Sequence, residues 1–149
     1  MSDNQTTQEF SIHSIYLKDV SFESPNSPAI FQEKVQPQVQ LNLGVNTNPL
    51  EQEVFEVVLS LTVTAKLGER TAFLVELQQA GIFRLRGFDD EHLKPMLGIY
   101  CPNVLFPYAR ESISSLVTKG GFPPLLLEPV NFEAIYAQHM EQQQPENLQ

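Results

Sequence analysis

Residues 54–79 read VFEVVLSLTVTAKLGERTAFLVELQQ, and their pattern decides the fold class. Every second residue from Phe55 to Ala65 is apolar, which is the period of a β-strand with one buried face. The residues Leu67-Gly68-Glu69-Arg70 are typical of a tight hairpin turn. Residues 71–79 then alternate again. The segment therefore predicts two antiparallel strands, residues 54–66 and 71–79, joined by a hairpin.

Two further strands are predicted before this hairpin. Residues 10–23 indicate a long strand with a bulge near its middle, because their apolar side chains change parity along it. Val39, Leu41 and Leu43 alternate with polar residues and predict a strand with one covered face, after which residues 44–50 are expected to turn the chain. Four strands joined in this way predict an antiparallel sheet with one covered face.

Helical signals follow the strands. The acidic residues 89–91 can begin a first helical stretch, which Pro95 should keep short or irregular. Pro107 suits the first turn of a longer helix, and Gly120 suits the left-handed position at its end. Asn131 can cap a last helix. Strands followed by helices predict an α+β fold, with helices packed on one face of a four-stranded antiparallel sheet.

Length and charge limit the organisation and the partners of the chain. Its 149 residues suit one domain, which we expect at residues 10–141 between flexible polar tails at residues 1–9 and 142–149. The net charge of −9, from 18 acidic and 9 basic residues, argues against nucleic acid as a partner. The sequence contains no apolar run of membrane-spanning length and no signal-peptide pattern at its start. We therefore expect a cytoplasmic protein without direct membrane insertion.

Patterns typical of enzymes are missing from the sequence. It contains no GxxxxGK[ST] loop, no GxGxxG after a strand and no GxSxG elbow, and its histidines lie far apart. We therefore expect no catalytic residues, no metal and no cofactor, and we expect Cys101 to be a buried structural residue. Apolar residues in the proline-flanked loop at residues 24–37 hint at a binding surface. A small-ligand-binding or enzymatic α+β domain and a purely structural oligomer remain alternatives.

Several segments together resemble the SecB family of protein-export chaperones. The most specific is YCPNVLFPYARE at residues 100–111, and the others are residues 16–28, 54–69, 72–83 and 121–132. The resemblance extends over residues 10–141. It implies an ATP-independent holdase that binds unfolded secretory precursor proteins, keeps them export-competent and delivers them to the translocation motor SecA. It also implies a homotetramer built as a dimer of dimers.

The resemblance also implies roles for individual residues. It places SecA binding at Asp19, Glu23, Leu74 and Glu76. It assigns an effect on the oligomer interface to Val75, Leu77 and Gln79, with the helix around residues 109–117 between dimers. It places the client-binding groove among apolar residues of the first two strands, the loop between them and the last helix: Phe22, Phe31, Val39, Leu41, Leu43, Phe132, Ile135, Tyr136 and Met140. Because side chains alternate along a strand, Leu74 and Glu76 should face solvent while Val75, Leu77 and Gln79 face inward.

Overall fold

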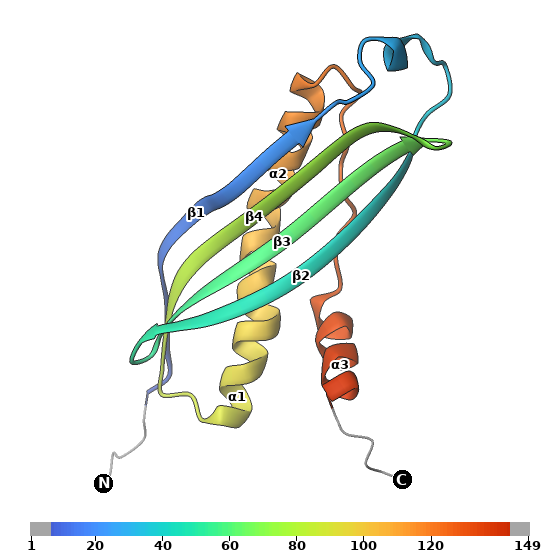
Figure 1. Cartoon of the computed structure of the whole chain (residues 1–149). Coiled ribbons are helices and arrows are strands. Elements are labelled where there is room, and N and C mark those ends of the chain that lie inside the picture. The colour runs from blue at the N-terminus through green and yellow to red at the C-terminus, as the bar shows by residue number, and fades with distance from the viewer. Residues whose placement is uncertain (1–6, 144–149) are drawn as a thin grey trace, which may run out of the picture.

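Strands β3 (Val54–Leu67) and β4 (Arg70–Arg86) form the centre of a four-stranded antiparallel sheet (Figure 1). They are joined by the predicted turn, in which Gly68 adopts a positive φ of 63°. Strand β1 (Glu9–Glu23) pairs with β4, and strand β2 (Gln38–Glu51) pairs with β3, so that the order is β1-β4-β3-β2. The predicted sheet is thus confirmed, with β1 and β2 at its edges.

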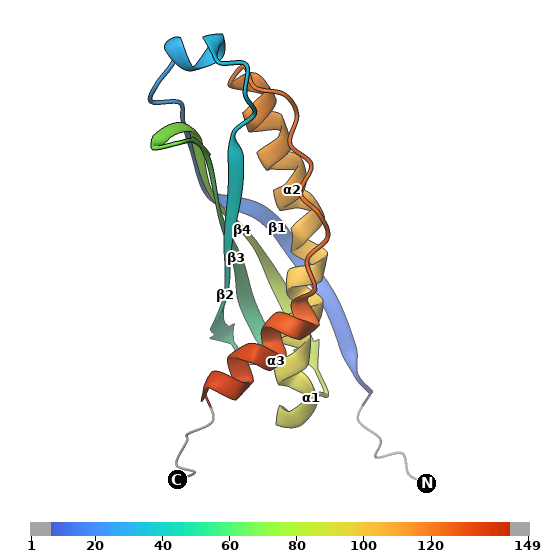
Figure 2. The same cartoon turned by 90° about the vertical axis from the view of Figure 1, so that its right-hand side faces the viewer.

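The computed structural model describes residues 7–143. Of the tails predicted at residues 1–9 and 142–149, residues 1–6 and 144–149 lie outside this range. Within it, Glu9 already belongs to the first strand, and residues 142–143 belong to the last helix. The α-helices all lie on one side of the sheet, as Figure 2 shows with the sheet seen nearly edge-on. This arrangement confirms the predicted α+β fold, and no α-helix of residues 7–143 covers the other face of the sheet.

The core lies between the sheet and helix α2 (Cys101–Lys119). The alternate residues of β3 that were predicted to share one apolar face are buried from Val57 to Ala65. Helix α2 contributes Leu105, Ala109 and Ile113, which recur every fourth residue and therefore lie along one side of the helix. Burial of each large side chain of this kind stabilises the fold by about 1.5–3 kcal/mol.

Strand β1 contains two bulges where the sequence predicted one. Its register with β4 shifts between Ile12 and Ser14 and again between Leu17 and Asp19. Each extra residue reverses the alternation, so the apolar residues before, between and after the bulges all pair with inward-facing residues of β4. The change of parity along residues 10–23 is therefore explained, and all of the apolar side chains of β1 lie on the helix side.

Two predictions of strand length were wrong. Residues 44–50 do not turn the chain, because β2 continues through Gly44 to Glu51 and the turn lies at residues 52–53, where Glu53 has a positive φ of 64°. Strand β4 does not end at Gln79 but extends to Arg86. Both strands contain a glycine, Gly44 in β2 and Gly81 in β4, and in both the pairing along β3 is continuous across it. Tertiary pairing thus outweighs the weak strand propensity of glycine.

The helical region begins as predicted and continues differently. Asp89 caps helix α1 (Asp90–Pro95) by accepting a hydrogen bond from the His92 backbone N–H at 3.0 Å. The chain then passes through a π-helical turn, η2 (Met96–Tyr100), directly into α2. The prediction for Pro107 was wrong, because it lies inside α2. Pro102 instead occupies the first turn of α2, directly after the π-helical turn.

The end of α2 also differs from the prediction. Gly120 is right-handed, and the left-handed residue is Gly121, with φ of 94°. Gly121 N–H donates to the Thr118 carbonyl and Phe122 N–H to the Val117 carbonyl, which is the hydrogen-bond pattern of a Schellman motif. The motif directs the chain into an extended linker alongside α2, and the linker leads to helix α3 (Phe132–Gln143) (Figure 2).

The loop between β1 and β2 contains the short 3-10 helix η1 (Ala29–Gln32). The apolar residues of this loop were predicted to form a binding surface. Ile30 is instead buried in the core, while Phe31 and Val35 are exposed. The loop is therefore fixed to the body of the protein by one apolar side chain and presents others to solvent.

Candidate functional site

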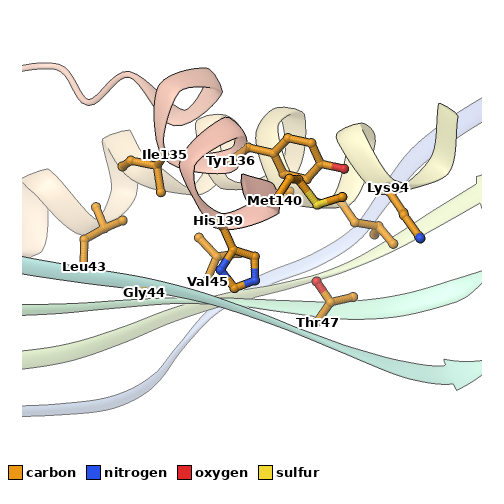
Figure 3. Close-up of a pocket in the computed structure, with 11 residues that line it drawn as sticks. Leu43, Gly44, Val45, Thr47, Lys94, Ile135, Tyr136, His139 and Met140 are labelled. Atoms are coloured by element: carbon orange, nitrogen blue, oxygen red, sulfur yellow. The ribbon is translucent and has the colours of Figure 1, made fainter. Parts of the chain in front are cut away.

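A pocket of about 500 Å³ opens between strand β2, the junction of α1 and η2, and helix α3 (Figure 3). Its lining residues are Leu43, Gly44, Val45, Thr47, Lys94, Leu97, Gly98, Ile135, Tyr136, His139 and Met140. Most of these side chains are aliphatic or aromatic. A largely apolar, open pocket of this kind is suited to holding apolar side chains of a ligand. It brings together Leu43, Ile135, Tyr136 and Met140 of the predicted client-binding groove.

Helix α3 forms one wall of this pocket because its first turn is fixed to the core. The Asn131 side-chain oxygen accepts a hydrogen bond from the Ala134 N–H at 3.0 Å, which confirms the predicted cap. Phe132 is 2% exposed, and its ring centroid lies 6.0 Å from that of Phe106 in α2. Phe132 therefore belongs to the core and anchors the helix, whereas Ile135, at 37% exposure, is open to a ligand.

The other predicted groove residues lie towards the opposite end of the sheet. The ring of Phe22 stacks on Phe73 with centroids 6.0 Å apart, and Phe31 lies 5.1 Å from Phe122. Phe73 and Phe122 are themselves 4.9 Å apart, so these rings form one aromatic cluster. The predicted groove residues are thus divided between two places, the pocket beside α3 and this aromatic cluster.

Strand β2 connects the two places. Val39, Leu41 and Leu43 pair with the inward-facing residues of β3, so they lie on the helix side of the edge strand. Leu41 packs partly buried against the core, and Val39 is exposed beside a second pocket of about 540 Å³. The helix-side edge of β2 is therefore an apolar strip from the aromatic cluster to the pocket beside α3.

The residues predicted to bind SecA lie together on the opposite face of the sheet. Glu23 pairs directly with Leu74, and Glu76 lies two residues further along β4 on the same face. Asp19 pairs with Gln78, so it also shares that face. The carboxylates of Asp19, Glu23 and Glu76 are exposed. The four residues thus form one acidic surface at the β1–β4 pair.

A polar cluster that no sequence pattern indicated lies on this same face. Glu56 of β3 is only 7% exposed and accepts hydrogen bonds from Lys18 Nζ at 2.7 Å, Tyr16 Oη at 2.6 Å and Asn48 Nδ2 at 3.0 Å. The hydrogen bond from Lys18, followed by that from Tyr16, lowers the pKa of Glu56 to about 2. Burial, with the adjacent Glu56 carboxylate, raises the pKa of Tyr16 to about 12. The alternation along β3 placed Glu56 on the solvent-facing side of the strand. Its hydrogen-bond partners come from the other strands of the sheet, so the sequence pattern of β3 alone does not predict them.

The residues predicted at the oligomer interface are buried within the single chain. Val75 and Leu77 are core residues beneath α2, and Gln79 is also buried. The Gln79 side chain donates a hydrogen bond to the Tyr16 carbonyl at 3.1 Å, and so fixes β1 at the second bulge. Their inward orientation agrees with the predicted parity.

Exposed apolar side chains lie on β1 instead. Leu17 is 44% exposed although it faces the helix side, and Ile12 and Val20 are similarly exposed. Leu17 shares a pocket with Tyr108 of α2, whose ring is also exposed. These residues, Ile12, Leu17, Val20 and Tyr108, form what we call the β1 stripe. The sequence pattern did not predict the β1 stripe, because the two bulges determine which residues of β1 lie on the same face of the sheet.

Cys101 is buried, as predicted, and burial raises the pKa of its thiol to about 12. Residues 7–143 contain no group of three or more acidic, histidine or cysteine side chains placed to hold a metal ion. No described helix combines the length and apolarity that a membrane span requires.

Comparisons with known proteins agree with this geometry. A family model described as preprotein translocase subunit SecB matches residues 3–143. The protein-export protein SecB of Nitrosococcus oceani is 57% identical over 151 residues, covering 96% of this chain and 92% of the relative. That of Methylococcus capsulatus is 54% identical over 142 residues, covering 95% of this chain and 92% of the relative.

A solved structure shares the fold at much lower sequence similarity. It is the Mycobacterium tuberculosis SecB-like chaperone Rv1957 in complex with a ChAD peptide from the antitoxin HigA1. The TM-score is 0.68 at 20% identity, and the match covers 81% of this chain and 90% of that chain. The same arrangement of sheet and helices is therefore found in a chain whose sequence has largely diverged.

Proposed function

This chain belongs to the SecB family, and from that premise we propose that it is an ATP-independent chaperone for protein export. It binds unfolded secretory precursor proteins in the cytoplasm, keeps them export-competent and delivers them to SecA. It acts by binding and is not an enzyme. Its relatives in Methylococcus capsulatus and Nitrosococcus oceani are named as protein-export proteins, which supports this assignment.

The observation that carries the proposal is the apolar pocket beside α3. An unfolded client exposes apolar side chains that a folded protein would bury. The pocket offers about 500 Å³ lined mainly by apolar residues such as Leu43, Ile135 and Met140. Transfer of client side chains into it gains about 25 cal/mol for each Å² of apolar area removed from water. Binding of this kind depends on apolarity and needs no particular client sequence.

Assembly into a tetramer would allow several pockets, each of which binds weakly, to hold one client firmly. The β1 stripe supports self-association, because exposed apolar side chains grouped on one surface are typical of a protein interface. A dimer of dimers would carry several copies of the pocket. Segments of one client chain that bind several pockets at once dissociate slowly, because each bound segment raises the local concentration of the others.

The acidic surface of Asp19, Glu23 and Glu76 is the proposed docking site for SecA, with Leu74 as its apolar member. It lies on the face of the sheet that the helices leave open. Clustered carboxylates attract a basic partner segment and orient its approach. Since the client pocket lies on the helix side, docking on this surface would leave the client in place.

The proposal is tested by the aggregation of an unfolded client. A chemically unfolded, slow-folding precursor is diluted into buffer without ATP, and light scattering is followed with and without the assembled protein. We expect suppression near one tetramer per client. The Ile135→Asp variant places a charge in the pocket and should lose most of this suppression. Leu50→Asp makes the same kind of change at an exposed residue that does not line the pocket, and it should suppress scattering normally.

The two alternative functions predict other outcomes. Unchanged scattering at a several-fold excess of tetramer would overturn the chaperone proposal. In that case, saturable binding of a small molecule would favour a ligand-binding domain. Full assembly without any binding would favour a structural oligomer.

A further inference from the structure

Lys18 lies at the edge of the acidic surface proposed to bind SecA. The register of β1 shifts between Leu17 and Asp19, so the alternation of side chains is interrupted at Lys18. Lys18 contacts Glu56 on the open face of the sheet, and Asp19, the next residue, lies on the same face. The second bulge therefore places a cation next to a carboxylate of the proposed docking surface.

Glu56 holds this lysine at a distance from the acidic surface. The Lys18 Nζ atom lies 2.7 Å from Glu56 Oε2, in an ion pair. Across the sheet, Glu56 is opposite Ile82 of β4. Asp19 is opposite Gln78, four residues nearer the start of that strand, or about 13 Å at a rise of about 3.3 Å per residue. The Lys18 side chain therefore extends from the edge of the acidic surface towards Glu56, away from the other carboxylates.

The carboxylate of Glu56 is itself fixed in place. Tyr16 Oη donates a hydrogen bond to the same oxygen as Lys18 at 2.6 Å, and Asn48 Nδ2 donates one to the other oxygen at 3.0 Å. The Glu56 side chain is 10% exposed, against 44% for that of Lys18. Because salt screens a partly buried ion pair less than an exposed one, the pair persists at physiological ionic strength.

The carboxylates of the acidic surface, in contrast, have no cation of their own. Asp19, Glu23 and Glu76 are exposed and form no ion pair with any other residue of the range that the structure describes. Their charges are therefore available to a basic partner. Without Glu56, the Lys18 ammonium group would be drawn to the neighbouring carboxylate of Asp19 and would compete with the partner for it.

We propose that Glu56 is a positioning residue for SecA docking, which holds Lys18 in a neutral pair and so keeps the acidic surface free for its partner. This inference rests on the proposed function, because it assumes that SecA binds at Asp19, Glu23 and Glu76. Glu56 is buried, so it acts through Lys18 rather than by contact with SecA. Neutralising the lysine keeps the potential of the surface negative, which favours the approach of a basic segment.

The test compares Glu56→Gln with the double variant Lys18→Gln/Glu56→Gln, by surface plasmon resonance with immobilised SecA. In Glu56→Gln the amide no longer neutralises the Lys18 ammonium group, so we expect the Kd for SecA to rise about three- to fivefold, roughly the effect of one exposed ion pair. The double variant has the net charge of the natural protein, and its Kd should return to within about twofold of the natural value. This rescue separates positioning from a structural role, because removal of Lys18 cannot repair a disturbed β1.

Two further variants complete the comparison. Glu51→Gln makes the same change of net charge at an exposed residue at the end of β2, and it should keep the natural affinity for SecA. Lys18→Gln leaves Glu56 in place, so it tests the pairing even if Glu56→Gln fails to assemble. Its Kd should stay within about twofold of the natural value, because a paired lysine does not screen the acidic surface. All variants are compared as assembled protein, verified by sedimentation velocity, and their affinity for an unfolded client should be unchanged.

The outcomes separate this inference from the function on which it rests. Natural affinity in Glu56→Gln, or a loss equal to that in Glu51→Gln, would overturn the role of Glu56. A double variant that binds as weakly as Glu56→Gln would overturn the action through Lys18, and so would severalfold tighter binding by Lys18→Gln. If the natural protein itself does not bind SecA, the proposed docking function is refuted, and this inference is refuted with it.

Discussion

The ring of Tyr136 lies against the backbone of Gly98, so closely that a Cβ atom at Gly98 would come within 2.5 Å of Tyr136 Cδ1. Gly98 belongs to the π-helical turn η2, and Tyr136 belongs to α3. The absence of a side chain at residue 98 therefore sets how near α3 can approach η2. Since both residues line the pocket, this contact also sets its width.

Gly98→Ala should weaken client binding. The added methyl group would displace the Tyr136 ring and move α3 away from η2, so we expect the Kd for an unfolded client to rise about threefold or more, the loss of roughly 0.7 kcal/mol of packing. The matched control is Gly44→Ala, which lines the same pocket but has no atom within 4 Å of the added Cβ. The measurement is client affinity by fluorescence anisotropy. Equal affinities of the two variants would contradict the role of Gly98.

The cluster around Glu56 should make stability depend on pH. Its folded pKa of about 2 lies below its ordinary value of 4.5, so the charged form stabilises the fold above pH 4.5. This contribution is lost as the pH falls from 4.5 towards 2, because the carboxyl group then takes up a proton. Glu56→Gln should cost about 1–2 kcal/mol at pH 7 through the loss of the charge-assisted hydrogen bond from Lys18.

Urea unfolding at a fixed protein concentration measures this effect, because the stability of an oligomer depends on concentration. The difference between the natural protein and Glu56→Gln should be largest at pH 7 and should decrease below pH 4.5. Glu69→Gln, in the exposed turn between β3 and β4, should have the same free energy of unfolding as the natural protein at pH 7 and below pH 4.5. A difference that stays constant with pH would show that the Glu56 charge is not responsible.

Glu76→Lys should weaken SecA binding by about fivefold or more, since it replaces an attractive charge on the docking surface with a repulsive one. Client binding should be unchanged, because the pocket lies on the other side of the sheet. Glu128→Lys makes the same change in the linker, away from the acidic surface, and should retain SecA affinity. Surface plasmon resonance with immobilised SecA would measure the SecA affinity of both variants. Normal binding by Glu76→Lys would count against the docking site.

Leu17→Asp should disturb assembly without unfolding the chain. Leu17 lies in the β1 stripe and is nearly half exposed, so a charge there is tolerated by the single chain but costly in an interface. Sedimentation velocity should show a shift from four chains to smaller species. Val35→Asp introduces the same charge at another exposed apolar residue and should remain assembled. A stable Leu17→Asp tetramer would remove the β1 stripe from the interface.

Local patterns were sufficient for the parts of the fold that local physics decides. The hairpin at Gly68 and the cap at Asn131 were predicted because a turn residue and a side-chain cap act within a few residues. Alternation along β3 predicted its buried face for the same reason. Alternation along β4 likewise predicted that the successive residues Leu74 and Val75 lie on opposite faces of the sheet.

The remainder depends on contacts that are distant in sequence. Gly44 suggested a turn, but β3 pairs with β2 on both sides of it. Pro107 suggested a helix start, but Leu105 and Ala109 on either side of it are buried under the same sheet and keep the helix continuous. The two places where the groove residues gather could not be separated from sequence, because Phe22 and Ile135 are equally apolar and only the fold puts them at different ends.

The alternation along β4 has a consequence for how this protein can change over evolutionary time. Val75, Leu77 and Gln79 are buried within the fold, while Leu74 and Glu76, between and beside them, lie on the face of the proposed docking surface. Along this short stretch of β4, residues of the core thus alternate with residues of the proposed docking surface. A substitution at an exposed residue leaves the buried residues unchanged, so the affinity for a partner can change during evolution while the fold is retained.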